Sequence, residues 1–190
     1  DIREILEYGE IKTPTTKEDK INARGKKIVL SAVKEFALEN EISYIQPSSL
    51  KDESVYNKLK EIDPDLIVVV AYGKIIPKNI IDLPKFGIIN VHSSILPKYR
   101  GASPIHSALI NGDDKTGVSI MFINEGLDTG DILLTDEITI NINTTYNDLL
   151  ETLSKMGANL ILKYIENKDN ITGIKQGDNF TLASKLLKNE

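Results

Sequence analysis

The sequence contains no cysteine and only two histidines among 190 residues. Without cysteine the chain can form no disulfide, no thiolate zinc site and no cysteine nucleophile. A lack of cysteine is also typical of proteins from a reducing compartment. Two histidines are too few for a histidine-rich cluster, so we expect no metal.

Long hydrophobic runs are missing as well. The longest apolar run covers residues 66–71, far fewer than the roughly 18 residues that a membrane-spanning helix needs. The charged start, Asp1-Ile2-Arg3-Glu4, has no signal-peptide pattern. We therefore expect a cytoplasmic protein with no membrane partner.

The composition is that of one ordinary globular domain. The chain has 41% hydrophobic residues and 23 basic against 28 acidic side chains, a net charge of −5. A chain of this length buries roughly 70% of the surface that its unfolded form exposes, so it needs no disulfide to hold a core. The negative charge argues against a strong general nucleic-acid binder.

Helical patterns alternate with short apolar runs in the first half, which predicts an α/β fold. We expect a helix over residues 28–39, a short strand over 42–45 and a second helix around residues 55–62. The runs at 66–71 and 86–91 do not alternate, so we expect central strands with both faces buried. These features predict a Rossmann-like, open and mostly parallel sheet with helices on both faces.

The second half changes character. Alternating residues over 118–122 and 132–140, joined by the loop 124–130, predict an antiparallel hairpin with one packed face. Residues 146–165 have the spacing of a long amphipathic helix. From Lys175 onward the periodicity fails, and we expect a linker or tail.

The most unusual stretch is residues 90–101, which opens at the end of a predicted buried strand. Ligands of open parallel sheets bind beyond the carboxyl ends of the strands. Asn90 and His92 are two apart on a strand and therefore share one side. An amide and an imidazole can together hold an oxygen that becomes negative during acyl transfer. The alternative is an ordinary structural turn.

Other polar residues have two interpretations each. A carboxylate that orients the imidazole could come from Glu125, Asp128 or Asp131 in the hairpin loop. Ser103-Pro104 predicts a helix start, which puts His106 in the first turn, on the helix surface or in a pocket wall. Asp113-Asp114 fits a solvated turn or a weak divalent-ion site.

Arg24-Gly25-Lys26-Lys27 is the one basic cluster in this acidic chain. It is either a solvated loop or a contact for phosphate, because clustered lysine and arginine supply the sequence-independent part of nucleic-acid affinity. No aromatic residues interleave with it to stack on bases.

Three segments resemble the folate-dependent formyltransferases. They are residues 90–105, beginning Asn90-Val91-His92 and running through Ser94-Ile95-Leu96-Pro97, then residues 117–121 and residues 126–131. Within the family, the chain is most similar to members that formylate methionyl-tRNA. The basic cluster 24–27, residues 46–51 and residues 181–186 favour those members.

The resemblance implies a reaction and its catalytic residues. The α-amine of methionyl-tRNA would attack the formyl carbon of 10-formyltetrahydrofolate, the co-substrate. Asn90, His92 and Asp128 match the family's catalytic residues. Asn90 and protonated His92 would stabilise the oxyanion, and Asp128 would keep the imidazole charged.

The resemblance also implies where the ligands bind. Ser94, Ile95, Leu96 and Pro97 match the folate-binding tetrapeptide, and Gly73 and Ile75 belong to a segment that walls the pterin pocket. Arg24, Lys26 and Lys27 match a loop that faces tRNA. We expect a monomer whose partners are methionyl-tRNA and folate.

The chain departs from the family pattern at its ends. The family begins with a strand and a Gly-Thr-Pro turn that this sequence lacks, and the next strand, near Pro14, is polar. We expect a catalytic domain over residues 1–174 that is incomplete at its N-terminus. Residues 175–190 would be a linker toward a C-terminal domain that this sequence does not include.

Two alternatives remain at the level of the sequence. One is a related formyltransferase or hydrolase that acts on another amine, such as a nucleotide-sugar amine or glycinamide ribonucleotide. The other is a folate-binding module that is inactive because it is truncated.

Overall fold

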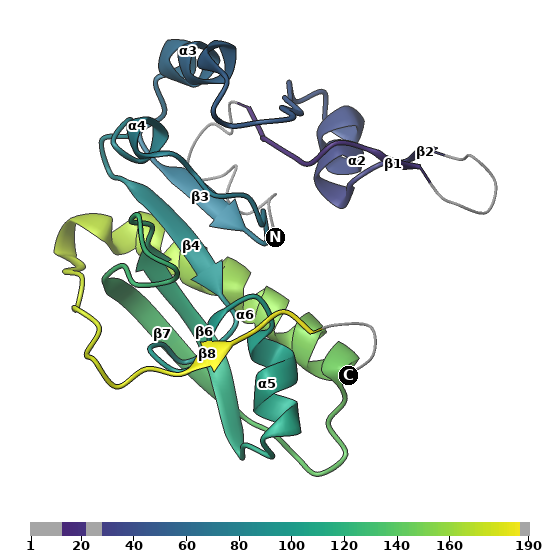
Figure 1. Ribbon diagram of the computed structural model, residues 1–190, viewed down its shortest axis with the longest axis vertical. Helices are drawn as coiled ribbons and strands as arrows, with labels where there is room; N and C mark the ends of the chain where they lie inside the picture. Colours follow the sequence, from purple (N-terminus) through teal and green to yellow (C-terminus); the bar gives the residue numbers. More distant parts are fainter. Residues whose placement is uncertain (1–12, 22–27, 187–190) are drawn as a thin grey trace.

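The computed structural model describes residues 13–21 and 28–186, arranged as a mixed sheet with helices on both faces (Figure 1). The first part of the described chain contains β1 (Lys20–Ile21), β2 (Ile28–Val29), α2 (Ala32–Glu39), α3 (Glu53–Ile62), β3 (Ile67–Val70) and α4 (Lys78–Ile81). The second part contains β4 (Ile88–His92), β5 (Arg100–Gly101), α5 (Pro104–Ile110), β6 (Lys115–Phe122), β7 (Ile132–Thr139), α6 (Tyr146–Asn167), the 3-10 turn η1 (Lys168–Asn170) and β8 (Leu182–Ala183).

The main sheet has the strand order β3-β4-β6-β7. β3 and β4 are parallel, whereas β4 with β6 and β6 with β7 are antiparallel. The Rossmann-like α/β fold and the antiparallel hairpin that the sequence predicts are therefore confirmed. Within the described residues the sheet is therefore mixed, with one parallel and two antiparallel pairings.

Two apolar cores lie on opposite faces of this sheet. On one face α5 and α6 pack against residues such as Ile89 and Ile120. On the other face α3 and α4 pack against Ile67 and Ile88. Among the described residues, no helix is both long enough and apolar enough to cross a membrane.

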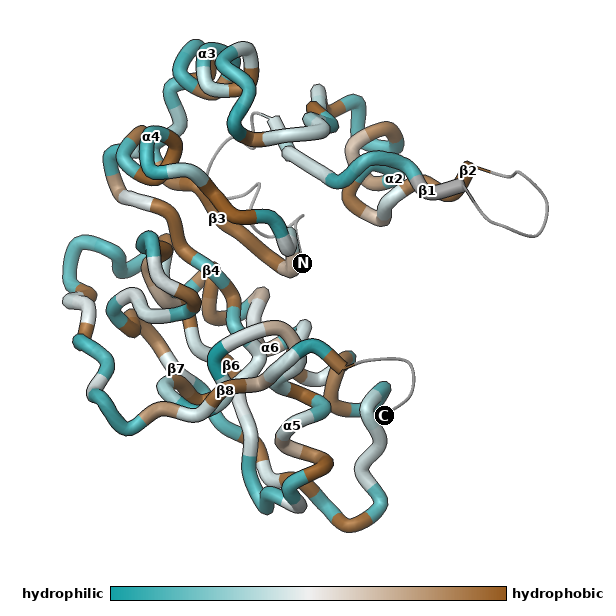
Figure 2. The backbone as a smooth tube through the Cα atoms, in the orientation of Figure 1, coloured by the Kyte–Doolittle hydropathy of each residue, from teal (hydrophilic) through white to brown (hydrophobic). Residues whose placement is uncertain are grey.

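The strand β3 differs from the expectation that both of its faces are buried. It is hydrophobic along its whole length (Figure 2), yet Val68 is 37% exposed and Val70 is 59% exposed. Ile67 and Val69 pack under α3 and α4. Val68 and Val70 pair with Ile89 and Val91 on the face that α6 covers, but α6 packs mainly on β4, β6 and β7.

Two boundaries near the N-terminus also differ. The helix expected over residues 28–39 begins only at Ala32, because the Ser31 hydroxyl accepts a hydrogen bond from the Lys34 amide and caps it. Residues 28–29 instead pair with β1. The strand expected over 42–45 is reduced to a single parallel bridge between Ile45 and Thr15.

The hairpin has less exposure than its alternating pattern predicts. In β6, residues Thr116 through Met121 are all buried, on both faces. β6 lies between β4 and β7, so neither of its edges is free. Its polar Ser119, fully buried, bonds to the loop that follows β4.

The C-terminal segment lies against the domain. Ile174 forms an antiparallel bridge with Ile132, and β8 pairs in parallel with β5. The described part of the predicted linker over 175–190 therefore follows the domain through Ala183. Its contacts are mostly polar, which explains why apolar periodicity did not reveal them. A continuation into a further domain stays a prediction.

Candidate active site

The strand β4 carries Asn90 and His92 to one face of the sheet. In the register, Asn90 lies between Val69 and Met121, and His92 lies beside Ser119. The intervening Val91 points to the opposite face, where it contacts α6 at Gly157. The structure therefore brings together the two polar residues that the sequence placed on one side of a strand.

His92 is 5% exposed and is held through one ring nitrogen. Its Nε2 lies 2.8 Å from the carbonyl oxygen of Tyr99. Because a carbonyl oxygen can only accept, Nε2 carries the hydrogen and donates it. Nδ1 is then the nitrogen that can take up or release a proton.

Asp128 is the carboxylate that faces this Nδ1. Its Oδ2 lies 3.6 Å from Nδ1 of His92 and accepts a 2.7 Å hydrogen bond from the backbone N–H of Gly101. Of the three acidic residues considered in the hairpin loop, it is the one whose carboxylate pairs with His92 within the described chain. A charged imidazole would form an ion pair with it.

Asn90 is half-buried. Within residues 13–21 and 28–186 its side-chain amide has no hydrogen-bond partner. An amide that presents two N–H donors without a protein acceptor is suited to an oxygen of a bound molecule.

The tetrapeptide Ser94-Ile95-Leu96-Pro97 turns immediately after β4. Ser94 and Leu96 are buried and bond within the protein: the Ser94 hydroxyl donates to the Lys98 carbonyl at 2.5 Å, and the Leu96 N–H donates to Ser119 at 3.0 Å. Ile95 and Pro97 are half-buried. These two side chains, with the backbone of the turn, are the parts of the tetrapeptide that remain available to a ligand.

Gly73 and Ile75 lie in the loop that follows β3. Since β3 and β4 are parallel, this loop and the tetrapeptide leave the sheet at the same edge. Ile75 is 90% exposed and offers an open apolar side chain there. In the same loop, burial raises the pKa of the Tyr72 hydroxyl, so that side chain stays neutral.

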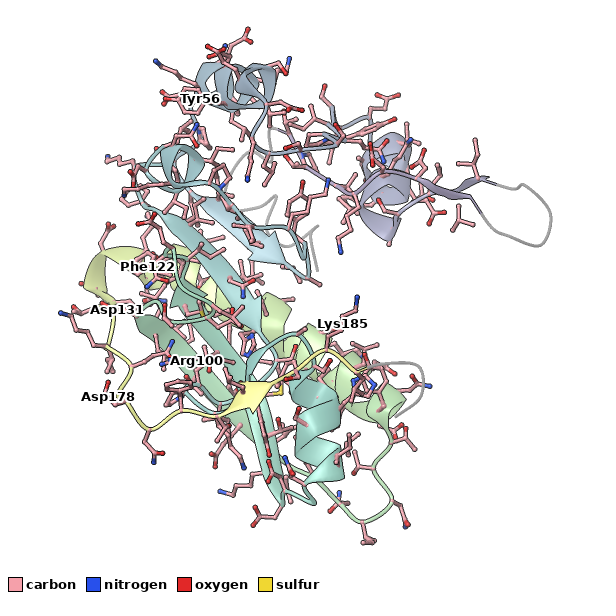
Figure 3. All side chains as sticks on the ribbon, viewed as in Figure 1. Tyr56, Arg100, Phe122, Asp131, Asp178 and Lys185 are labelled. Carbon is pink, nitrogen blue, oxygen red and sulfur yellow. The ribbon has the colours of Figure 1, made fainter. Side chains whose placement is uncertain are left out.

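Sequence reasoning missed the contribution of the C-terminal segment. The Thr181 hydroxyl accepts from the Tyr99 N–H at 2.8 Å, and Gln176 bonds to the backbone of Asp128 and Gly130. Arg100, which Figure 3 labels beside this segment, donates to Gln176 at 2.9 Å. The polar composition of residues 175–180 gave no signal of these contacts, because it is equally typical of a linker.

The predicted tRNA-facing residues Arg24, Lys26 and Lys27 lie outside the described residues. Nearby, Lys34 donates to Asp19 at 2.6 Å and to Gln46 at 2.8 Å. The bond with Lys34 lowers the pKa of the Asp19 carboxyl and raises that of Lys34.

Two other candidates have structural partners. His106 stacks on Tyr146, with ring centroids 4.2 Å apart, and joins α5 to α6. Asp113 accepts from Lys98 at 2.7 Å, a contact that raises the pKa of the lysine. At Asp113-Asp114, Lys98 would therefore compete with a divalent ion for the carboxylate of Asp113.

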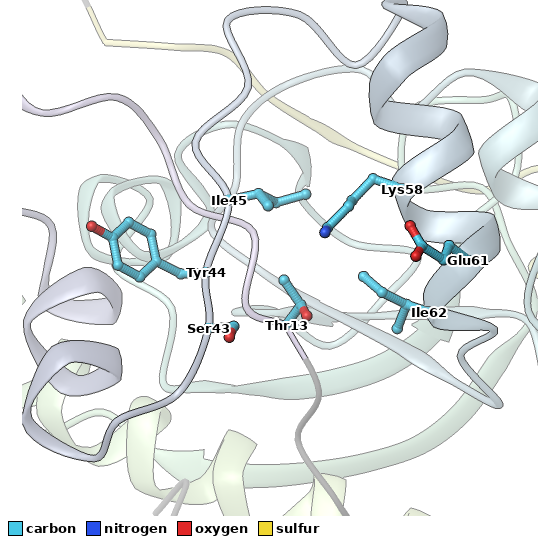
Figure 4. Close-up of a pocket in the computed structure, with 7 residues that line it drawn as sticks. All are labelled: Thr13, Ser43, Tyr44, Ile45, Lys58, Glu61 and Ile62. Carbon is cyan, nitrogen blue, oxygen red and sulfur yellow. The ribbon is translucent and has the colours of Figure 1, made fainter.

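A pocket of about 510 Å³ lies elsewhere (Figure 4). It is lined by Thr13, Ser43, Tyr44, Ile45, Lys58, Glu61 and Ile62. None of the predicted site residues lines it. The polar groups at the end of β4, and not cavity size, therefore identify the candidate active site.

Comparison with known proteins covers most of the chain. A family model described as formyl transferase matches residues 7–165. The methionyl-tRNA formyltransferase of Fusobacterium nucleatum is 47% identical over 191 residues, which is 100% of this chain and 62% of that protein. That of Clostridium acetobutylicum is 45% identical over 192 residues, with the same coverage. The chain thus spans less than two thirds of the length of these relatives.

Solved structures of formyltransferases share the fold. The formyltransferase PseJ from Anoxybacillus kamchatkensis, in complex with UDP-4,6-dideoxy-4-formamido-L-AltNAc and tetrahydrofolate, matches with a TM-score of 0.65 and 25% identity over 90% of this chain and 85% of that one. Phosphoribosylglycinamide formyltransferase from Streptococcus pneumoniae matches with a TM-score of 0.74 and 19% identity over 89% and 92%. With the family model matched over residues 7–165, these findings show that the chain belongs to the formyl transferase family.

Proposed function

We propose that the protein transfers the formyl group of 10-formyltetrahydrofolate to the α-amine of methionyl-tRNA. The observation that carries this proposal is the pairing of His92 with Asp128, whose carboxylate lies 3.6 Å from the imidazole, on the face of β4 that also carries Asn90. The relatives at 45–47% identity are named for this reaction. Other family members act on other amines, so the acceptor is the part that needs direct measurement.

The chemistry needs one bond formed and one broken. The neutral amine nitrogen bonds to the formyl carbon, and the bond from that carbon to N10 of the folate breaks. The amine loses one proton and N10 gains one. As the amine attacks, the formyl oxygen becomes negative, and hydrogen-bond donors that are already in position stabilise it.

The protein supplies these donors from β4. The amide of Asn90, which has no hydrogen-bond partner among the described residues, donates to the formyl oxygen. Nε2 of His92 is occupied by the Tyr99 carbonyl, so Nδ1 is the nitrogen that carries the exchangeable proton. The carboxylate of Asp128 lies 3.6 Å from this nitrogen and, through water, helps to move the proton from the amine toward N10.

Folate binding falls to the edge of the sheet beside these groups. Ile95, Pro97 and the exposed Ile75 provide apolar surface for its rings. The buried Ser94 and Leu96 shape the turn from within. Gly73, with a φ of +66°, lets the neighbouring loop turn at this edge without strain.

The acceptor end of tRNA would meet the basic cluster Arg24, Lys26 and Lys27. Its charge would act locally, because the chain as a whole carries −5. We further propose that the protein is a monomer. We also propose that it works in the cytoplasm, where aminoacylated tRNA and folate are both present.

The direct test is a transfer assay with three acceptors. Formyl transfer from 10-formyltetrahydrofolate to methionyl-tRNA is measured beside transfer to glycinamide ribonucleotide and to an amino sugar linked to a nucleotide. We expect transfer to methionyl-tRNA alone. Preference for either small acceptor would contradict the proposal.

Release of formate without transfer would identify a hydrolase instead. Binding of folate by calorimetry with no turnover in any assay would identify a binding module. Both outcomes would overturn the proposed reaction.

A further inference from the structure

The side chain of Gln176 bridges the two loops that surround His92. Its Nε2 donates to the carbonyl oxygens of Asp128 at 2.9 Å and Gly130 at 2.7 Å. Its Oε1 accepts from Nε of Arg100 at 2.9 Å. Both ends of one amide are therefore used, and they join residues that lie 76, 48 and 46 positions away along the chain.

These are the segments that define the position of the imidazole. Tyr99, whose carbonyl accepts from Nε2 of His92, directly precedes Arg100. Asp128, which faces Nδ1, is itself one of the residues held by Gln176. Gln176 thus connects the side chain of Arg100, on one side of the ring, with the backbone of the loop that carries Asp128, on the other, without contacting the ring.

Both segments adopt backbone conformations that need support. Tyr99 has a φ of +64° and Asp128 a φ of +51°. Residues other than glycine rarely adopt this left-handed region, and they keep it where surrounding contacts hold them. The Gln176 amide and the Gly101 N–H are such contacts for Asp128.

We propose that Gln176 is a positioning residue for His92 and Asp128. This inference rests on the proposed function, since it deepens the account of the same site. An amide suits the role because it donates and accepts at once, whereas a carboxylate only accepts. Arg100 completes the bridge: it is 7% exposed, and its guanidinium lies 4.4 Å from the centre of the Phe180 ring.

The C-terminal segment has attachments that do not depend on Gln176. The Thr181 hydroxyl accepts a hydrogen bond from the Tyr99 N–H, and the Thr181 carbonyl accepts one from the Arg100 N–H. The Ala183 carbonyl accepts from the Ala102 N–H at 2.8 Å. Loss of Gln176 should therefore leave the segment bound, and should release only the side chain of Arg100 and the backbone of the loop at Asp128 and Gly130. A Gln176 variant therefore tests the positioning of His92 and Asp128 without detaching the C-terminal segment.

The test compares Gln176→Leu and Gln176→Glu with Asn179→Leu as the matched control. Asn179 is an exposed amide in the same segment, with no hydrogen-bond partner among the described residues. Leucine removes both ends of the bridge, and glutamate keeps the acceptor but loses the donor. We expect kcat for formyl transfer to fall about 10- to 100-fold in both variants with KM within about threefold, since small displacements of catalytic groups cost this much. Asn179→Leu should match the parent protein.

A second measurement reports on the ring itself. In protein labelled with ¹⁵N-histidine, the signals of His92 are identified by their loss in His92→Gln. At a pH where the ring is neutral, the parent should show hydrogen fixed on Nε2, and both Gln176 variants should show a mixture of tautomers. Circular dichroism checks that each variant folds. If Gln176→Leu does not fold, the result for Gln176→Glu decides whether Gln176 positions the ring.

An unchanged ring signature in a folded Gln176 variant would overturn the inference, as would a rise in KM with kcat preserved. If the parent protein transfers no formyl group, the proposed function fails. The ¹⁵N measurement still tests the positioning role in that case, so the two failures are distinguishable.

Discussion

At the scale of single residues, the imidazole of His92 meets two acceptors of different charge. The neutral carbonyl of Tyr99 takes the hydrogen of Nε2, and the carboxylate of Asp128 lies near Nδ1. A neutral acceptor on one side fixes the tautomer, and a negative one on the other can pair with a charged ring. One side chain can therefore change its charge during the reaction without changing its orientation.

Replacement of either His92 or Asp128 should lower turnover strongly. We expect His92→Gln and Asp128→Asn each to reduce kcat about 100- to 1,000-fold, the usual loss for a donor or acid-base group of such a site. Tetrahydrofolate should still bind, because its proposed contacts are Ile75, Ile95 and Pro97. Steady-state kinetics and calorimetry measure the two effects separately.

The other histidine provides the control. His106 stacks on Tyr146 between two helices and has no place in the proposed reaction. His106→Gln should keep kcat within about twofold of the parent. Near-normal turnover in His92→Gln or Asp128→Asn would refute the assignment of these residues.

At the scale of secondary-structure elements, short pairings near the site depend on close backbone approach. Gly101 in β5 has a φ of +117°, and a Cβ there would lie 2.7 Å from the carbonyl oxygen of Ala183 in β8. Both the backbone angle and the neighbouring backbone exclude a side chain. The two-residue strands β5 and β8 can pair in this way only with glycine at that position.

Gly101→Ala should therefore lower the free energy of unfolding by about 2 kcal/mol, from strain and from displacement of β8. Urea denaturation measures this change. Gly177→Ala is the matched control in the same region, since nothing lies within 4 Å of its Cβ position. Equal stability of the two variants would show that β5 and β8 do not pair as described.

The long helix α6 has its start fixed by a capping box. The Thr145 hydroxyl accepts from the Asp148 N–H at 3.3 Å, while the Asp148 carboxylate accepts from the Thr145 N–H at 2.9 Å. The Asp148 carboxylate accepts hydrogen bonds from the side chain and from the backbone N–H of Thr145. The side-chain bond is the larger of the two causes that hold the pKa of Asp148 below its usual value of 3.8. The helix thus begins where these two residues satisfy its first free N–H groups.

This cap predicts a pH dependence of stability. Because the folded pKa lies below 3.8, the unfolded chain binds more protons in that range, so the stabilisation is present above about pH 4 and is lost as the pH falls through the folded pKa. Thermal unfolding from about pH 6 to about pH 2.5 should show Asp148→Asn below the parent at the upper end and converging with it at the lower end. Thr145→Ala should lose part of the same dependence. A constant offset at all pH values would exclude this origin.

At the scale of the whole molecule, charge is distributed unevenly. The chain is acidic overall, with a net charge of −5, and its one basic cluster is at residues 24–27. Long-range repulsion from the acidic surface and local attraction from the cluster would together direct tRNA to one region. Such binding must depend on salt.

The combined change of Arg24, Lys26 and Lys27 to alanine should weaken binding of methionyl-tRNA. The slope of log affinity against log salt should become shallower by about 0.9 for each phosphate that the variant no longer neutralises. Affinity for tetrahydrofolate should not change. Fluorescence titrations over a series of salt concentrations measure both, and parallel slopes for the parent and the variant would remove the cluster from the tRNA site.

The sequence by itself determined the elements with strong local signals. The helix over 146–165, the hairpin and the strand at 86–91 followed from apolar spacing, because burial of one face imposes that spacing on each element. The polar motif after β4 was recognisable because its residues are consecutive in the chain. The family could be assigned at this level.

Only the tertiary structure decided what lies beside His92. Asp128 could not be chosen over Glu125 and Asp131 from spacing, because a loop fixes no direction until it is packed. Gln176 was hidden in a polar segment whose hydrogen bonds reach residues 46 to 76 positions away. The exposure of Val68 and Val70 likewise depends on where α6 ends over the sheet, and contacts between segments so distant along the chain leave no periodic mark in the sequence.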